Sequence, residues 1–135
     1  MIETGVVITR TNEACYWHRP LGRSASYLPD SRTLWDVLWA TYQADNLLGF
    51  AHSHPGTGAP APSQEDLSTF GAIEAALGRP LLWWITSTDR LIEIRKSTMD
   101  SIPGREIYAC QLLDDREARV RFPWLDQLRV ESQLP

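Results

Sequence analysis

The sequence predicts an α/β fold in which one mixed β-sheet is flanked by helices within a single domain. Two observations carry this prediction. Short apolar and β-branched runs bounded by turn residues recur along the chain, as expected of strands. Between them lie two segments whose apolar residues return at three- and four-residue steps, as in amphipathic helices. The resulting order is strands, helix, strand, helix, strands.

Each element has its own signals. A helix over 31–45 follows an N-cap at Asp30 or Ser31, and a helix over 63–77 stops at Gly78. The segment from Asp114 is predicted to be helical with a break at Pro123, which cannot continue a helix. Strands are expected at residues 3–9, 14–17, 47–54, 81–85, 91–95 and 105–113.

Several aromatic residues leave two readings open. Trp35 and Trp39 belong to the apolar stripe of the first helix, which predicts a core position, although such a pair also suits a partner surface. Trp83 and Trp84 point to opposite faces of their strand, so we expect at least one to be partly exposed, where it would help to grip an extended peptide. His18, beside Arg-Pro, is expected in a loop and is assigned no role.

Composition sets limits on the class of protein. The 135 residues suit one domain, with a core over about 1–113 and a C-terminal extension over 114–135. The charge of −4, with acids and bases interspersed, lacks the basic footprint of a nucleic-acid-binding protein. Cys15 and Cys110 imply no disulfide framework. The chain shows neither a signal peptide nor an apolar run of membrane-spanning length, so we expect a soluble, cytoplasmic protein whose oligomeric state is open.

The chemistry is concentrated around two histidines. Residues two apart on a strand point to the same face, so His52 and His54 project side by side. Pro55 ends the strand, a Gly/Pro-rich turn follows, and the next helix opens with a carboxylate at Asp66. Two imidazoles and one carboxylate leave a fourth tetrahedral position for water, which is the arrangement of catalytic zinc. We therefore predict one Zn²⁺ per chain, with His52, His54 and Asp66 as ligands.

A metal hydrolase also needs a base that is not a ligand and a donor to the developing oxyanion. Glu3 lies at the head of the first strand, which is expected to neighbour the histidine strand, and Ser63 lies at the start of the helix. Structural explanations compete with these roles. Ser63-x-x-Asp66 is a capping box, although capping and ligation can coexist on one carboxylate. A Glu near a chain terminus is most often solvated.

The pattern of Glu3, then His52-Ser-His-Pro55, then Pro62-Ser-x-x-Asp66 resembles the JAMM (MPN+, Mov34/JAB) zinc metalloproteases, over roughly residues 1–95. The resemblance implies zinc ligands at His52, His54 and Asp66, Glu3 as general acid/base, and Ser63 as oxyanion donor. It also implies a fold with the layout of the cytidine deaminases, and hydrolysis of an amide bond in the C-terminal tail of a ubiquitin-like or sulfur-carrier protein.

The chain departs from the family pattern in two ways. The loop from His54 to Ser63 is one residue longer than usual, so counting from His54 alone would make Glu65 the ligand. The intact Pro-Ser-x-x-Asp motif favours Asp66 instead. A helix usually precedes the catalytic Glu; it is either dispensable here or replaced by another element such as the C-terminal tail. Glu13, in the turn after the first strand, is the rival base.

Other classes of function fit less well. A non-catalytic MPN scaffold typically lacks ligands, and here all are present. A zinc nucleobase deaminase has a similar layout but requires His-x-Glu with a later Pro-Cys-x-x-Cys, and the two cysteines are too far apart for that motif. The helical His-Glu-x-x-His of common metalloproteases is absent. We expect neither nucleic acid nor a membrane as a partner.

Overall fold

The computed structural model describes residues 1–97 and 107–133. The strands are β1 (Gly5–Thr9), β2 (Ala14–His18), β3 (Leu47–Ser53), β4 (Leu82–Thr86), β5 (Leu91–Lys96) and β6 (Tyr108–Leu113). The helices are α1 (Arg32–Gln43), α2 (Gln64–Leu77), α3 (Asp115–Arg121) and α4 (Leu125–Gln133). The predicted elements are therefore found, apart from the start of the last expected strand, whose residues 105–106 lie outside the described residues.

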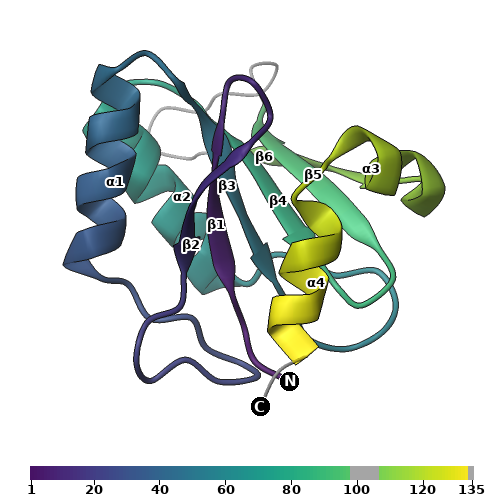
Figure 1. The fold of residues 1–135 in the computed structure, drawn as a ribbon. Coiled ribbons are helices and arrows are strands. Elements are labelled where there is room, and N and C mark those ends of the chain that lie inside the picture. Colours follow the sequence, from purple (N-terminus) through teal and green to yellow (C-terminus); the bar gives the residue numbers. More distant parts are fainter. Residues whose placement is uncertain (98–106, 134–135) are drawn as a thin grey trace.

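The described strands form one six-stranded mixed sheet in the order β2-β1-β3-β4-β5-β6 (Figure 1). Strands β3 and β4 are parallel and are joined through α2, while the other neighbouring pairs are antiparallel. Tight turns suffice for antiparallel neighbours, whereas a parallel pair needs a crossover connection. The prediction of a mixed α/β sheet is confirmed.

Helices α1 and α2 cover one face of the sheet (Figure 1). Leu34 and Leu38 of α1 are buried there, as the three- and four-residue spacing predicts. The aromatic residues of the stripe follow them only in part: Trp35 is half-buried and packs against this core, whereas Trp39 is 49% exposed. Trp39 packs instead against Tyr42 of the same helix, with ring centroids 5.7 Å apart.

Helices α3 and α4 cover the opposite face, so residues 114–133 pack on the sheet. Trp84 packs against Phe122 and Trp124 of this segment, with ring centroids 5.7 and 5.3 Å apart. On the other face Trp83 stacks on Phe70 at 4.2 Å. Both tryptophans of β4 are 1% exposed, so the expectation that one would be accessible is wrong. Helices cover the strand on both sides.

His18 ends β2 and is 1% exposed, which corrects its assignment to a loop. Its Nε2 lies 2.7 Å from the Pro29 carbonyl and therefore donates to it. Among the described residues, nothing pairs with its buried Nδ1. Burial lowers the pKa of this imidazole and outweighs the opposing effect of the Pro29 hydrogen bond.

None of the helices in the described part of the chain is both long enough and apolar enough to cross a bilayer.

Candidate metal centre

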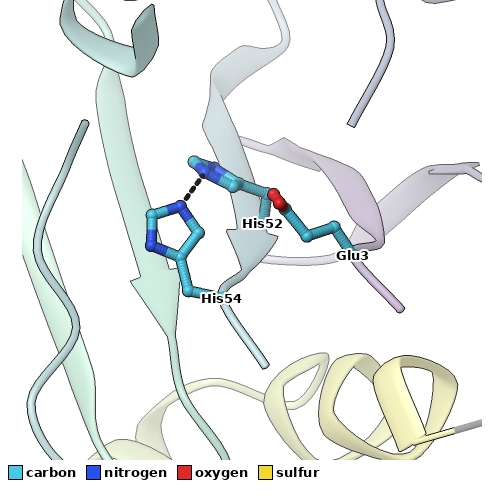
Figure 2. Close-up of side chains that lie close together, drawn as sticks. All are labelled: Glu3, His52 and His54. Carbon is cyan, nitrogen blue, oxygen red and sulfur yellow. Dashed lines mark hydrogen bonds between the residues drawn. The ribbon is translucent and has the colours of Figure 1, made fainter. Parts of the chain in front are cut away.

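The two predicted histidines meet at the end of β3. His52 is buried within the strand. His54 is the first residue after the strand, and its N–H donates to the Thr86 carbonyl at 2.9 Å. This bond continues the β3–β4 pairing past the formal strand end, so the alternation of side chains is preserved. The two rings stand on one face with their Nε2 atoms 3.1 Å apart (Figure 2).

Glu3 reaches the same place from β1. Gly5 is the register partner of His52 in the antiparallel β1–β3 pair. The pairing extends outward, because the Ser53 N–H donates to the Thr4 carbonyl at 3.0 Å and the Thr4 N–H donates to Ser53 Oγ at 2.9 Å. Glu3 therefore stands beside His54 and on its face of the sheet, and its carboxylate points at the histidines (Figure 2). One ligand atom each from Glu3, His52 and His54 lie within 4.8 Å of one another, which makes these residues a candidate metal site.

Glu3 is held rigidly although it lies near the chain start. The Ile2 N–H donates to the Ser132 carbonyl of α4 at 2.7 Å, and the Glu3 N–H donates to the Ser24 carbonyl at 2.8 Å. Glu3 is only 6% exposed, so it is not a solvated terminal residue. Burial raises the pKa of its carboxyl to about 7. The charge of His54 acts to lower this pKa, and the negative charges of Asp66 and Glu65 act to raise it.

Asp66 arrives on the first turn of α2. It completes the capping box: Ser63 Oγ accepts from the Asp66 N–H at 3.0 Å, and Asp66 Oδ2 accepts from the Ser63 N–H at 2.9 Å. The same carboxylate contacts both imidazoles, with Oδ1 at 3.3 Å from His52 Nε2 and Oδ2 at 3.1 Å from His54 Nε2. Capping and contact with the histidines thus coexist on one side chain.

The electrostatics of this cluster favour a cation. Burial acts to raise the pKa of Asp66, but the hydrogen bonds of His52 and His54 outweigh it, so the pKa lies well below its ordinary value. For His54, burial acts to lower the pKa, but the hydrogen bond and charge of Asp66 and the charge of Glu3 raise it above the ordinary value. The carboxylates of Asp66 and Glu3 thus stabilise positive charge at His54, as they would the charge of a bound metal ion.

The distances suit zinc. A tetrahedral zinc ion with Zn–N bonds of about 2.0–2.1 Å holds its ligand atoms about 3.3 Å apart. The separations between His52 Nε2, His54 Nε2 and the Asp66 oxygens are 3.1–3.3 Å. The backbone of Ala61 also acts to raise the pKa of His54.

Phe50 and Gly5 pack beside His52. The Phe50 ring packs next to His52 on β3, with centroids 6.3 Å apart and planes 28° from parallel. This ring lies over Gly5 of β1, where an added Cβ would come within 2.3 Å of Phe50 Cζ. Glycine at position 5 is therefore required for this arrangement of the sheet face.

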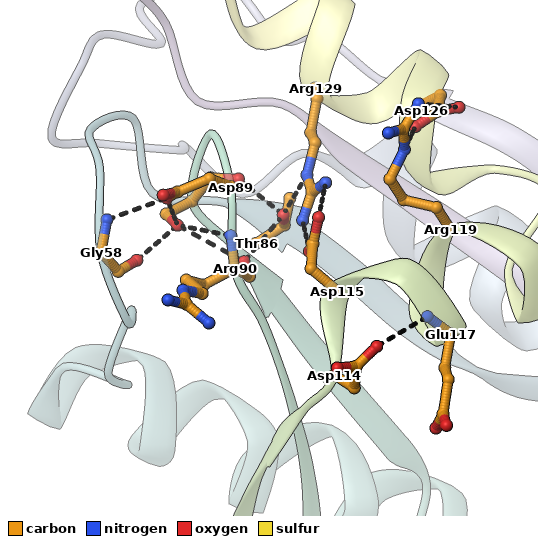
Figure 3. Close-up of polar contacts among 11 residues, drawn as sticks. Gly58, Thr86, Asp89, Arg90, Asp114, Asp115, Glu117, Arg119, Asp126 and Arg129 are labelled. Carbon is orange, nitrogen blue, oxygen red and sulfur yellow. Dashed lines mark hydrogen bonds and ion pairs between the residues drawn. The ribbon is translucent and has the colours of Figure 1, made fainter.

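The loop between His54 and Ser63 is fastened by the β4–β5 turn. Asp89 Oδ1 accepts from the Gly58 N–H at 2.9 Å (Figure 3). The Ser87 hydroxyl donates to the Gly58 carbonyl. The Thr88 N–H donates to the Gly56 carbonyl at 2.8 Å. Behind the turn, Arg129 of α4 bonds Thr86 Oγ1 at 3.0 Å and pairs with Asp115 (Figure 3). Sequence reasoning predicted only a turn here, because nothing in the pattern shows which loop a turn will hold.

The remaining predicted residues are placed as follows. Ser63 Oγ accepts the capping bond, so its own proton is free to be donated toward the site. Glu65 is exposed, and the carboxylate that contacts the two imidazoles is that of Asp66. Glu13 is exposed beyond the opposite end of β1, where its carbonyl bonds the Thr9 N–H.

The sequence also matches a family model, described as prokaryotic homologs of the JAB domain, over residues 3–100. This chain belongs to that family. The match begins at Glu3 and contains His52, His54, Ser63 and Asp66, so the candidate centre lies within the JAB region. A comparison with curated proteins gave no match. JAB domains of this prokaryotic family are often JAMM metalloproteases, and this one has the candidate metal site that such an activity needs.

Proposed function

We propose that this JAB domain is a zinc-dependent peptidase or isopeptidase that cleaves an amide bond in the C-terminal tail of a ubiquitin-like or sulfur-carrier protein. One observation carries the proposal. Two imidazoles and the Asp66 carboxylate lie at mutual distances of 3.1–3.3 Å, with a second, buried carboxylate from Glu3 beside them. Three ligands and a neighbouring base are the set that metal-assisted hydrolysis requires.

In this assignment His52, His54 and Asp66 hold the zinc. When bound, the ion supplies Lewis acidity that lowers the pKa of water and polarises the substrate carbonyl. Glu3 also lies within ligand distance of the histidines. We assign Glu3 to proton transfer instead, because Asp66 already supplies the third ligand and Glu3 enters from a different strand.

Glu3 takes the proton of the attacking water and returns it to the leaving amine. In the absence of the ion, burial raises the pKa of this carboxyl to about 7. A base that titrates near neutral pH can both accept and return a proton. The second transfer restores the carboxylate, so the proton balance closes over one turnover. The rigid anchoring of Ile2 and Glu3 keeps this group in place for both steps.

Ser63 stabilises the oxyanion that forms when water adds to the carbonyl. Its hydroxyl keeps a free proton while Oγ accepts the capping bond, and it stands at the N-terminus of α2, where the helix dipole also favours negative charge. Asp89 and Ser87 steady the loop that leads to Ser63.

The test is turnover of a ubiquitin-like fusion with a C-terminal reporter, measured on zinc-loaded protein, after chelation, and after zinc is restored. We expect activity to disappear with the metal and return with it. Protein that holds one zinc per chain but cleaves neither ubiquitin-like nor sulfur-carrier fusions would favour the non-catalytic scaffold instead.

A further inference from the structure

A cavity of about 380 Å³ opens beside the candidate metal centre. Glu3, His52, His54 and Asp66 line one part of it. It extends from there between α1, α2 and the sheet, and its lining also includes solvent-exposed residues, those of the 25–27 loop and Thr69 of α2. The metal centre thus lies in one wall of a larger space.

The space is too large to serve the metal alone. A water molecule occupies about 30 Å³ of liquid volume, so an ion and its water fill only a small part of this cavity. Pockets that hold small organic ligands have volumes of about 300–1,000 Å³. The cavity can therefore take a bulky organic group while the metal site is occupied.

The walls define the chemistry of that group. Away from the metal, the cavity is lined by buried apolar side chains: Leu34, Leu38, Phe50, Phe70, Ile73 and Trp83. Among the described lining residues none is Lys or Arg, whereas Asp30 and Glu65 add acidic groups. An apolar occupant gains from leaving water. Away from the metal, an acidic occupant would meet like charge and no Lys or Arg to pair with.

We propose that this cavity is a specificity pocket for a large apolar side chain, leucine or phenylalanine in size, next to the bond that is cleaved. The proposal rests on the proposed peptidase function and narrows its substrate. A tail of glycines would place no side chain in the cavity and would gain no contact with its apolar walls. The preferred substrate therefore carries a bulky apolar residue at the cleavage point.

Helix α2 offers one variant at the edge of the cavity and a matched control outside it. Asp66, Thr69, Phe70 and Ile73 line the cavity and lie on one face of α2, in keeping with helical spacing. Thr69 is exposed, so Thr69→Trp adds an indole at this edge without disturbing the core. Ser68 is exposed on the same helix but does not line the cavity, so Ser68→Trp is the control.

The experiment uses zinc-loaded protein and two series of reporter peptides, in which the residue before or after the scissile bond is Gly, Asp, Leu or Phe. In one series we expect kcat/KM for Leu or Phe to exceed that for Gly by at least about tenfold, with Asp the poorest. Thr69→Trp should reduce the Phe-to-Gly ratio, and Ser68→Trp should retain it. Equal or better cleavage of Gly in both series, or an unchanged ratio in Thr69→Trp, would overturn the proposal.

A binding measurement separates this proposal from the peptidase function. The same peptides, labelled with a fluorophore, are titrated against Glu3→Gln protein and followed by anisotropy. We expect Leu and Phe peptides to bind at least about tenfold more tightly than Gly peptides. This preference without turnover of any peptide by the wild type would refute the peptidase and keep the pocket. Turnover without any side-chain preference would do the reverse.

Discussion

His54 Nε2 lies 3.1 Å from Asp66 Oδ2, although one residue follows a buried strand and the other begins a helix beyond a Gly/Pro-rich loop. The contact closes the candidate metal centre, because it brings the carboxylate to histidines that one strand alone presents. A loop of this kind can absorb an extra residue while both of its ends stay fixed. The capping box fixes one end and the β3–β4 pairing fixes the other.

That contact predicts that zinc binding needs the carboxylate of Asp66 and not that of Glu65. Asp66→Asn should lower zinc affinity at least about tenfold, since even outer partners of a metal site are worth that much, while Glu65→Gln should bind zinc like the wild type. His52→Ala and His54→Ala should each abolish stoichiometric binding. Elemental analysis of purified protein, with circular dichroism to check folding, provides the measurement. A stronger effect at Glu65 than at Asp66 would show that the longer loop shifts the register of the ligand.

The β4–β5 turn should contribute to the site from a distance. Asp89→Ala removes the acceptor of the Gly58 N–H and frees the loop that leads to Ser63. The loss of one such hydrogen bond should lower kcat/KM roughly 2–10-fold, with little change in melting temperature. Asp126→Ala is the control, because Asp126 is likewise an exposed aspartate with a polar partner, Arg119, but lies away from the loop (Figure 3). Equal kinetics of the two variants would contradict a role for this turn.

The contact between Gly5 and Phe50 predicts a stability effect that also reaches the metal. Gly5→Ala should destabilise the protein by about 1–3 kcal/mol, because its Cβ overlaps the Phe50 ring. The displaced ring should also disturb His52, so zinc affinity should fall as well. Adding Phe50→Leu should relieve the overlap and restore part of the stability, as measured by urea unfolding. Full stability of Gly5→Ala alone would mean that the sheet face is less tightly packed than described.

His18 should make stability depend on pH. Its pKa in the folded protein is lowered from an ordinary value of 6.5, chiefly by burial. Below pH 6.5 His18 is protonated in the unfolded chain but stays neutral in the folded protein down to its lower pKa. The free energy of unfolding therefore falls as the pH drops from 6.5 toward that pKa. His18→Gln can still donate to the Pro29 carbonyl but cannot titrate. Urea unfolding of both proteins from pH 7.5 to 5.5, at constant zinc, should show a smaller loss for the variant; parallel curves would contradict this.

Local patterns sufficed to predict most of the fold. Hydrophobic periodicity, capping residues and turn residues predict every element to within a few positions, because these signals act between near neighbours in sequence. The same reason allows the candidate ligands to be identified from the sequence: a strand presents His52 and His54, and the start of a helix presents Asp66. Glu3 is different. The Glu3 N–H bonds the Ser24 carbonyl and the neighbouring Ile2 N–H bonds the Ser132 carbonyl of α4, and no local pattern specifies such distant partners.

The errors in the sequence-based expectations share one physical cause. The environment of Trp39, His18 and the pair Trp83–Trp84 is set by which helix covers which strand, and only tertiary structure decides this. Trp84 is buried because residues 114–133 fold back over the second face of the sheet. The apolar cavity was invisible for the same reason, since its walls come from α1, α2 and the sheet together.

The central claim is that Glu3 moves the proton while two histidines and Asp66 hold the zinc, and Glu3→Gln tests it most directly. Zinc content and turnover of a ubiquitin-like fusion are measured together, with Glu13→Gln as the control. We predict that Glu3→Gln keeps one zinc per chain and loses roughly 10²–10⁴-fold in kcat, because an amide cannot accept the proton, while Glu13→Gln matches the wild type. Loss of zinc from Glu3→Gln would make Glu3 a ligand, and full activity of that variant would contradict the account.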